Sequence, residues 1–225
     1  MCVIIHCPNG KRPKRKTLDA CAAHNPHGAG VAWRKRGVVH YRKGLDNDEL
    51  EPLIHSLDGD IVIHYRWASV GKPDPKLCHP FPITPSAPTH LHGKTDRVLF
   101  HNGTWRSWQD ALKYLPKSSM KRGLVSDTRV AAATINYSGV GALNKMAGKW
   151  VVYDSHTTTR YGHWEKMSGM HFSNMNWKPR KTVNGRMTPW PEEKVGNRYR
   201  MQRPDGTWTP WDDTQADLDY FSGKW

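Results

Sequence analysis

The chain has 225 residues, a mean hydropathy of −0.76, a formal net charge of +14 and a pI near 9.8. No apolar run approaches the ~20 residues of a membrane-spanning helix, and the apolar run Val3, Ile4 and Ile5 is too short for a signal peptide. We therefore expect a cytoplasmic protein with no membrane association. The charge favours polyanionic partners such as nucleic acid, although an ordinary basic surface explains it equally well.

The predicted elements are strands and helices in irregular order, so a doubly wound parallel sheet is disfavoured and an α+β fold with antiparallel sheets covered by helices is favoured. Leu50, Leu53 and Ile54 recur at helical spacing after a capping residue, Asp46 or Asn47. Strands are predicted at 2–6, 28–33, 38–43, 60–67, 97–101, 149–154, 158–165 and 169–172, and helices at 46–57, 107–115 and 126–137.

Between these elements, the basic run Lys11 to Lys16 is predicted to be a solvated loop, and residues 71–88, rich in proline, a long irregular loop. Ser107 with Asp110 predicts a capping box, and Ser126 is the predicted N-cap of the third helix.

After residue 177 prolines interrupt the chain, apolar periodicity weakens and tryptophans accumulate. We therefore predict a main domain over residues 1–177 and a Trp/Pro-rich appendage over 178–225. Asp205–Gly206 predicts a hairpin turn in this appendage.

The spacing of cysteines and histidines does not favour a metal site. There is no Cys-x-x-Cys pair, and none of the thirteen histidines forms a His-x-x-x-His pair on a plausible helix. We expect free thiols, no metal and no cofactor. The four cysteines are Cys2, Cys7, Cys21 and Cys78.

Cys2 is the first candidate for chemistry, because aminopeptidases remove an initiator methionine that precedes a small residue. The mature chain would then carry a thiol and a free α-amine on one residue. An α-amine has a pKa of roughly 7.7–8.0, so part of it is neutral at pH 7 and can accept the thiol proton. Taken alone, Cys2 is better explained as an ordinary buried cysteine on a first strand.

Six short segments in register change that interpretation, because together they resemble the class II glutamine amidotransferases of the N-terminal-nucleophile hydrolase superfamily. Val3 departs from the glycine of the family's Met-Cys-Gly-Ile opening. Some relatives are small, uncharacterised or phage-encoded, and the resemblance implies a four-layer αββα sandwich of two antiparallel sheets flanked by helices. The segments are Met1-Cys2-Val3-Ile4, Asn25-Pro26-His27-Gly28-Ala29-Gly30-Val31-Ala32, His64-Tyr65-Arg66-Trp67-Ala68-Ser69-Val70-Gly71, His79-Pro80-Phe81, His101-Asn102-Gly103 and Ser126-Asp127-Thr128.

The resemblance implies a role for each matching residue. Cys2 would be the nucleophile, and Asn102 with Gly103 the oxyanion hole. Arg66 would bind the α-carboxylate of the substrate and Asp127 its α-ammonium group. Simpler explanations stay open: a surface arginine, an Asn-Gly turn, and a carboxylate that stabilises the start of a helix.

Trp67, Ser69 and His79 would line the glutamine pocket. We expect His64 and His79 to shape the pocket and not to act as bases.

The implied reaction is hydrolysis of glutamine through a γ-glutamyl thioester, with release of ammonia. About 50 residues follow the glutaminase-like part, too few for a synthetase domain. The chain would be a lone glutaminase, a subunit that feeds a separate ammonia-accepting synthetase or modifying enzyme, or an amidase for another amide. If phage-encoded, it would act in the host cytoplasm.

A hypothesis of a different class is a basic nucleic-acid- or protein-binding module on a relict hydrolase fold. Lys11 to Lys16 would contact phosphates, and the tryptophans of the appendage would stack on bases.

Overall fold

The computed structural model describes residues 2–117, 119 and 123–178, together with the backbone of short strands at 180–181, 187–188, 192–195 and 198–201. The chain divides into two compact units, Met1–Lys178 and Pro179–Trp225.

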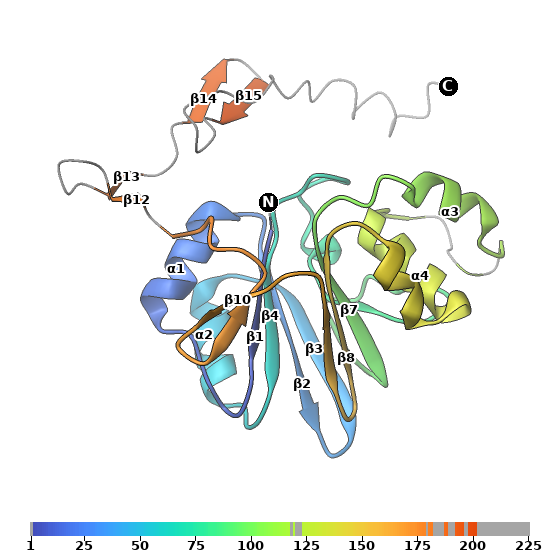
Figure 1. Ribbon diagram of the computed structural model, residues 1–225, viewed down its shortest axis with the longest axis horizontal. Coiled ribbons are helices and arrows are strands. Elements are labelled where there is room, and N and C mark those ends of the chain that lie inside the picture. The colour runs from blue at the N-terminus through green and yellow to red at the C-terminus, as the bar shows by residue number, and fades with distance from the viewer. Residues whose placement is uncertain are drawn as a thin grey trace. The chain divides into compact units, whose positions relative to one another are not determined.

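The first unit contains a seven-stranded antiparallel sheet (Figure 1). Its neighbouring strands β1 and β4 pair with Val3 opposite Tyr65 and Cys7 opposite Ile61. Every residue of both strands is buried, as expected where one face meets helices and the other a second sheet. The strands in sheet order are β10 (Glu165–Met167), β11 (Met170–Phe172), β1 (Val3–Cys7), β4 (Ile61–Tyr65), β2 (Ala29–Lys35), β3 (Val38–Leu45) and β6 (His92–Thr95).

A four-stranded antiparallel sheet packs against the first sheet. The layer between them is apolar: Ile4 and Val62 of one sheet share a buried cluster with Phe100 and Val151 of the other. Such interdigitation of two inner faces is how sheets stack in a sandwich. The strands in order are β5 (Phe81–Pro82), β7 (Arg97–Asn102), β8 (Lys149–Asp154) and β9 (Thr158–Tyr161).

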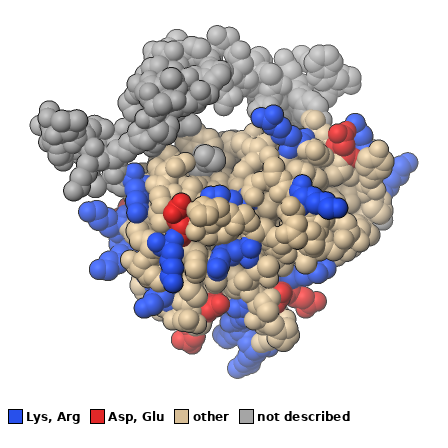
Figure 2. Space-filling view, in the orientation of Figure 1, with Lys and Arg blue, Asp and Glu red and all other residues tan. Residues whose placement is uncertain are grey.

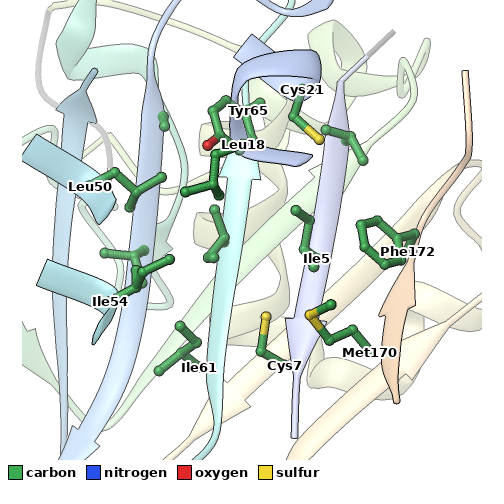
Figure 3. Packing of buried hydrophobic residues seen from close by; sticks show 14 of the residues in the cluster. Ile5, Cys7, Leu18, Cys21, Leu50, Ile54, Ile61, Tyr65, Met170 and Phe172 are labelled. Carbon is green, nitrogen blue, oxygen red and sulfur yellow. The ribbon is translucent and has the colours of Figure 1, made fainter. Parts of the chain in front are cut away.

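Helices form the two outer layers (Figure 1). α1 (Arg15–His24) and α2 (Asn47–His55) cover the seven-stranded sheet, and their residues Leu18 and Leu50 belong to one buried cluster with Ile5 and Phe172 of the sheet (Figure 3). On the other side, α4 (Asp127–Ser138) packs its alanines on the four-stranded sheet, next to α3 (Trp108–Tyr114) and two short 3₁₀ segments, Pro75–Leu77 and Val140–Lys145. The predicted α+β class and four-layer αββα sandwich are confirmed.

Two of the three predicted caps are present. Glu49 N–H donates to the Asp46 side chain at 2.9 Å in the capping box of α2, and Arg129 N–H donates to Ser126 Oγ at 3.2 Å at the start of α4. The predicted capping box of α3 is wrong: Ser107 makes no side-chain capping bond, and Asp110 contacts Lys113 Nζ at 2.9 Å instead.

The basic run Lys11 to Lys16 is a loop over residues 11–14, with Lys11 and Lys14 exposed as predicted, and the prediction is wrong for Arg15 and Lys16. Helix α1 begins at Arg15, and Arg12 donates to the carbonyls of Ile54 at 2.6 Å and Leu57 at 2.7 Å, at the end of α2. The helix escaped prediction because Leu18 and Cys21 are its only buried residues, which leaves a weak apolar pattern in a charged segment.

In the second unit, β12 (Arg180–Lys181) pairs antiparallel with β13 (Met187–Thr188), and β14 (Glu192–Val195) with β15 (Arg198–Met201). The hairpin predicted around Asp205–Gly206 and the tryptophans beyond Trp177 lie outside the described residues.

All four cysteines are free and buried, so the prediction of thiols is confirmed. None of the helices in the described segments has the length and apolar character needed to cross a membrane.

Candidate active site

One small cavity opens where the ends of several core elements meet. It is lined by Cys2 directly before β1, the segment 66–70 after β4, His79 before β5, residues at the end of β7 and the first residues of α4. The cavity holds about 20 Å³, enough for roughly one water molecule. The candidate residues that line it are Cys2, Arg66, Trp67, Ser69, His79, Gly103 and Asp127, so Asn102 is the one candidate absent from the lining.

Cys2 is 8% exposed, and its sulfur lies against the backbone of Trp67. The thiol donates to Trp67 O at 3.2 Å, and Sγ accepts from Trp67 N–H at 3.2 Å. Burial raises the pKa of the Cys2 thiol, while the Trp67 N–H and the nearby Arg66 act in the opposite direction. The thiol is therefore protonated near neutral pH and needs a base before it can attack.

Arg66 is buried at the end of β4 and organises the loop that follows it. Its Nη1 donates to Lys72 O at 3.0 Å and its Nη2 to Val70 O at 3.2 Å. A guanidinium has five N–H donors, so three are not used by these bonds. Burial lowers the pKa of Arg66, but an arginine stays charged in a protein.

Asp127 is the first residue of α4 and is 5% exposed. Its Oδ1 accepts from Thr128 N–H at 2.7 Å and its Oδ2 from Trp105 N–H at 2.9 Å. Burial raises the pKa of Asp127, and these N–H donors with Arg66 oppose that rise. The start of a helix also favours a negative charge. Thr128 Oγ1 also donates to Oδ1 at 3.3 Å, and His101 Nδ1 lies 3.6 Å from Oδ2. A carboxylate offers about four acceptor positions, so part of its capacity remains for a ligand cation.

Gly103 ends the β7 edge of the cavity with φ +147°, a conformation that side chains rarely adopt. A Cβ at this position would lie 3.0 Å from both His101 Nε2 and Gly148 Cα. Only glycine therefore fits here, and its backbone can approach a ligand closely.

The carboxamide of Asn102 is held on the other side of the strand end. Its Nδ2 donates to Ser173 Oγ at 2.8 Å, while its Oδ1 is buried without a hydrogen-bond partner among the described residues. One of the two amide N–H bonds is thus committed to Ser173, and one is left for another acceptor.

Three buried histidines lie beneath the cavity. The rings of His64 and His79 are 3.9 Å apart, and His101 stacks on Trp150 at 3.6 Å. Burial lowers the pKa of His64 and of His101 to about 3, and that of His79 well below its usual value. All three are neutral at pH 7 and therefore leave the charge of the cavity to Arg66 and Asp127.

Trp67 and Ser69 lie at the mouth of the cavity. The Trp67 ring is half-buried with its centroid 5.5 Å from that of His27, and the exposed Ser69 accepts a hydrogen bond from Thr104 Oγ1 at 3.2 Å. Among the described residues, no group of three or more His, Cys, Asp or Glu side chains is placed to hold a metal ion.

The sequence assigned no role to two residues that brace the nucleophile strand. Ser173 Oγ accepts from Ile4 N–H at 2.9 Å as well as from Asn102 Nδ2, and Asn174 Nδ2 donates to Cys2 O at 2.7 Å. The sequence feature that could have identified these two residues is the Ser-Asn pair directly after the last strand of the main domain.

Comparisons with known proteins support the fold. No protein-family model and no curated protein matches the sequence. Among solved structures, glutamine phosphoribosylpyrophosphate amidotransferase from B. subtilis, complexed with ADP and GMP, matches with a TM-score of 0.50 and 15% identity, over 94% of this chain and 49% of that chain. A structure described as the allosteric regulatory enzyme of purine biosynthesis matches with a TM-score of 0.52 and 15% identity, over 93% and 48%.

The chain therefore shares the N-terminal-nucleophile hydrolase fold of these amidotransferases and spans about half their length.

Proposed function

We propose that this chain is a glutamine amidotransferase-type amidohydrolase whose nucleophile is the thiol of Cys2. The observation that carries the proposal is the meeting of three groups in one cavity: a thiol, the cation Arg66 and the anion Asp127. The fold shared with glutamine amidotransferases adds support.

The two charges favour a free amino acid as substrate. The unused N–H donors of Arg66 suit an α-carboxylate, which a guanidinium binds with two parallel hydrogen bonds. The remaining acceptor positions of Asp127 suit an α-ammonium group. A peptide or a simple acyl amide would leave at least one of these buried charges without a partner, which is costly.

The reaction begins with the free α-amine of Cys2, which removal of Met1 would expose. Because burial keeps the thiol protonated, the neutral amine takes its proton as the sulfur attacks the side-chain amide carbon. The N–H of Gly103 and the remaining amide N–H of Asn102 would bind the oxyanion. The amine returns the proton to the leaving ammonia, and water then hydrolyses the γ-glutamyl thioester to glutamate and the free thiol.

Glutamine is larger than a space of about 20 Å³, so its binding would require a rearrangement of residues around the cavity. The ammonia would pass to a separate synthetase or modifying enzyme, in the host cytoplasm if the chain is phage-encoded, or be released. An amide other than glutamine is the alternative substrate for the same nucleophile.

The test compares Cys2→Ala with Cys21→Ala, a buried cysteine on α1 that packs in the sheet–helix core. We expect the first variant to lose ammonia release from glutamine and the second to keep it, with both folded by circular dichroism. A diazo-ketone analogue of glutamine should label the parent and Cys21→Ala with one molecule each, detected by intact mass, and should not label Cys2→Ala. Equal turnover of glutamine by Cys2→Ala and the parent would contradict the mechanism. An active protein whose intact mass shows that Met1 is fully retained would also contradict it.

A further inference from the structure

A second hollow lies where the chain crosses from one sheet to the other. β9 is the last strand of the four-stranded sheet and β10 the first strand of the seven-stranded sheet, and residues 162–164 connect them. The hollow, here called the β9–β11 groove, has a volume of about 660 Å³ and shares no lining residue with the Cys2 cavity. Its size is within the range of ligand sites. Its lining includes Arg160, His163, Trp164, Lys166 and His171.

The groove concentrates positive charge. Its lining contains no Asp or Glu, and the neighbouring Glu165 contacts the lining through His163, with Oε1 3.5 Å from Nε2. Within the described part of the chain neither Arg160 nor Lys166 forms an ion pair. The Arg160 guanidinium instead contacts His6 Nδ1. Burial, Arg160 and Lys166 all lower the pKa of His171, which indicates a positive potential in the groove. An anion placed there would be stabilised by both side chains.

Flat aromatic surfaces border the same charges. Trp164 is half-buried and its Nε1 donates to Tyr161 O at 3.1 Å, which fixes the indole, and the Arg160 guanidinium lies 6.0 Å from its ring centroid. His171 stacks on His6 with centroids 5.8 Å apart. Cations that alternate with fixed rings are the pattern used for single-stranded nucleic acid, where phosphates meet the cations and bases stack on the rings.

The basic charge of the rest of the surface is less suited to this role. Lys and Arg are spread over the face in view rather than gathered in one patch (Figure 2). The basic run Lys11 to Lys16 was predicted to contact phosphates in the nucleic-acid-binding hypothesis. In this run, Arg12 donates to carbonyls at the end of α2, and Arg15 forms ion pairs with carboxylates. The Lys11 side chain lies against the Gly169 turn between β10 and β11, and neither residue lines the groove.

We propose that the β9–β11 groove binds single-stranded nucleic acid, with phosphates between Arg160 and Lys166 and a base stacked on Trp164. A strand fits better than a free nucleotide because the groove is an open surface channel and the chain carries a net charge of +14. The site is independent of the proposed glutamine chemistry and would be present in a catalytically dead protein.

The test titrates a fluorescently labelled ten-nucleotide thymidine oligomer with the full chain over a range of salt concentrations. We expect saturable binding that weakens with salt. Lys166→Ala and Arg160→Ala should each lower affinity and reduce the log–log salt slope by about 0.7, the value for one phosphate contact on a single strand. Trp164→Leu should lower affinity roughly 10-fold and leave the slope unchanged, because stacking releases no counterions.

The matched control is Lys94→Ala, which removes the same charge from an exposed position on β6, the edge strand of the seven-stranded sheet opposite β10. We expect its affinity and slope to match the parent. Equal effects of Lys94→Ala and Lys166→Ala would show general attraction to a basic surface and would overturn the proposal. Thymidine monophosphate that binds as tightly as the oligomer would also overturn it, because the site would then recognise a nucleotide and not a strand.

Discussion

The Cys2 cavity and the outer surface of α1 and α2 both carry an arginine, but the two charges are held in different ways. On the surface, Arg15 lies 2.8 Å from Asp19, 2.9 Å from Asp48 and 3.1 Å from Glu51, so its charge is neutralised by side chains. In the cavity, the hydrogen bonds that Arg66 makes to other described residues go to the main-chain carbonyls of Val70 and Lys72.

Asp127 is held in the same manner, by backbone N–H groups instead of a cationic side chain. Backbone dipoles stabilise a buried charge without cancelling it, so Arg66 and Asp127 remain a full cation and a full anion. Arg12 and Arg129 are also held by main-chain carbonyls, so Arg66 and Asp127 are set apart by having charges that are not neutralised by a side chain and by lining the same cavity as Cys2.

The largest expected effect comes from Arg66→Ala, which removes the proposed carboxylate partner. We expect kcat/KM for glutamine to fall roughly 100- to 1,000-fold, the range for truncating one member of a buried charged pair. The same variant should lose little with 4-aminobutanamide, which is glutamine without its α-carboxylate. Steady-state ammonia release from both substrates is the measurement. An equal loss with both would show that Arg66 serves only to order the 67–72 loop.

The second prediction concerns the anion. Asp127→Asn keeps an oxygen that can accept from Thr128 N–H but loses the charge. We expect kcat/KM for glutamine to fall roughly 10- to 100-fold, as for the loss of a charged hydrogen bond. Glutaramate, which lacks the α-ammonium group, should be hydrolysed equally by parent and variant. A loss on glutaramate as large as that on glutamine would contradict an ammonium site.

Much of this arrangement was predictable because local patterns decide it. The apolar runs of β1 and β4 and the caps Asp46 and Ser126 mark element ends, and the residues of the cavity lie just beyond such ends. Cys2, Arg66, Gly103 and Asp127 themselves were named because the short segments that contain them resemble those of the class II glutamine amidotransferases. Their geometry, and thus their roles, stay predictions that the activity tests address.

The rest could not be predicted because it depends on distant pairings. Ser173 reaches Ile4 across 169 positions, and only the pairing of β11 with β1 makes that contact possible. The orientation of the Asn102 amide depends on its own hydrogen bond to Ser173, so it could not be predicted from the sequence either. Arg15 was assigned to a loop because its three carboxylate partners come from two helices, one of which the apolar pattern did not reveal.

The third prediction tests whether the cavity's charge belongs to Arg66 and Asp127 alone, with the histidines neutral. A histidine whose pKa is lowered on folding contributes stability above its unfolded pKa of about 6.5, and that stability is lost as pH falls. For His64 and His101, with pKa values of about 3, the loss is roughly 2 kcal/mol each by pH 5. Urea unfolding at pH 7 and pH 5 measures it.

A His101→Gln variant provides the control. The comparison uses only the decrease in the free energy of unfolding between pH 7 and pH 5, so a lower stability of the variant at both pH values does not affect it. We expect this decrease to be smaller in the variant than in the parent. The same drop in parent and variant would mean that folding does not lower the pKa of His101 and would contradict the prediction.

A smaller effect is expected at Ser173, which positions neighbours and carries no charge. In Ser173→Ala the Asn102 amide and Ile4 N–H lose their shared partner, so the oxyanion donors are held less precisely. We expect kcat to fall roughly 10-fold with little change in KM. Ser173→Thr, which keeps the hydroxyl, should restore most of the rate. A rise in KM with unchanged kcat would assign Ser173 to substrate binding instead.

The smallest effect is expected at Arg15, the counterpart of Arg66 in the comparison. Its side chain is about half exposed, and an exposed ion pair gains little because water screens the charges. We expect Arg15→Ala to leave glutamine turnover unchanged and to shift Tm by no more than about 2 °C. Thermal unfolding and ammonia release, measured beside Arg66→Ala, check both. A loss of activity in Arg15→Ala would break the distinction, because a charge already neutralised by three carboxylates would then matter to the ligand.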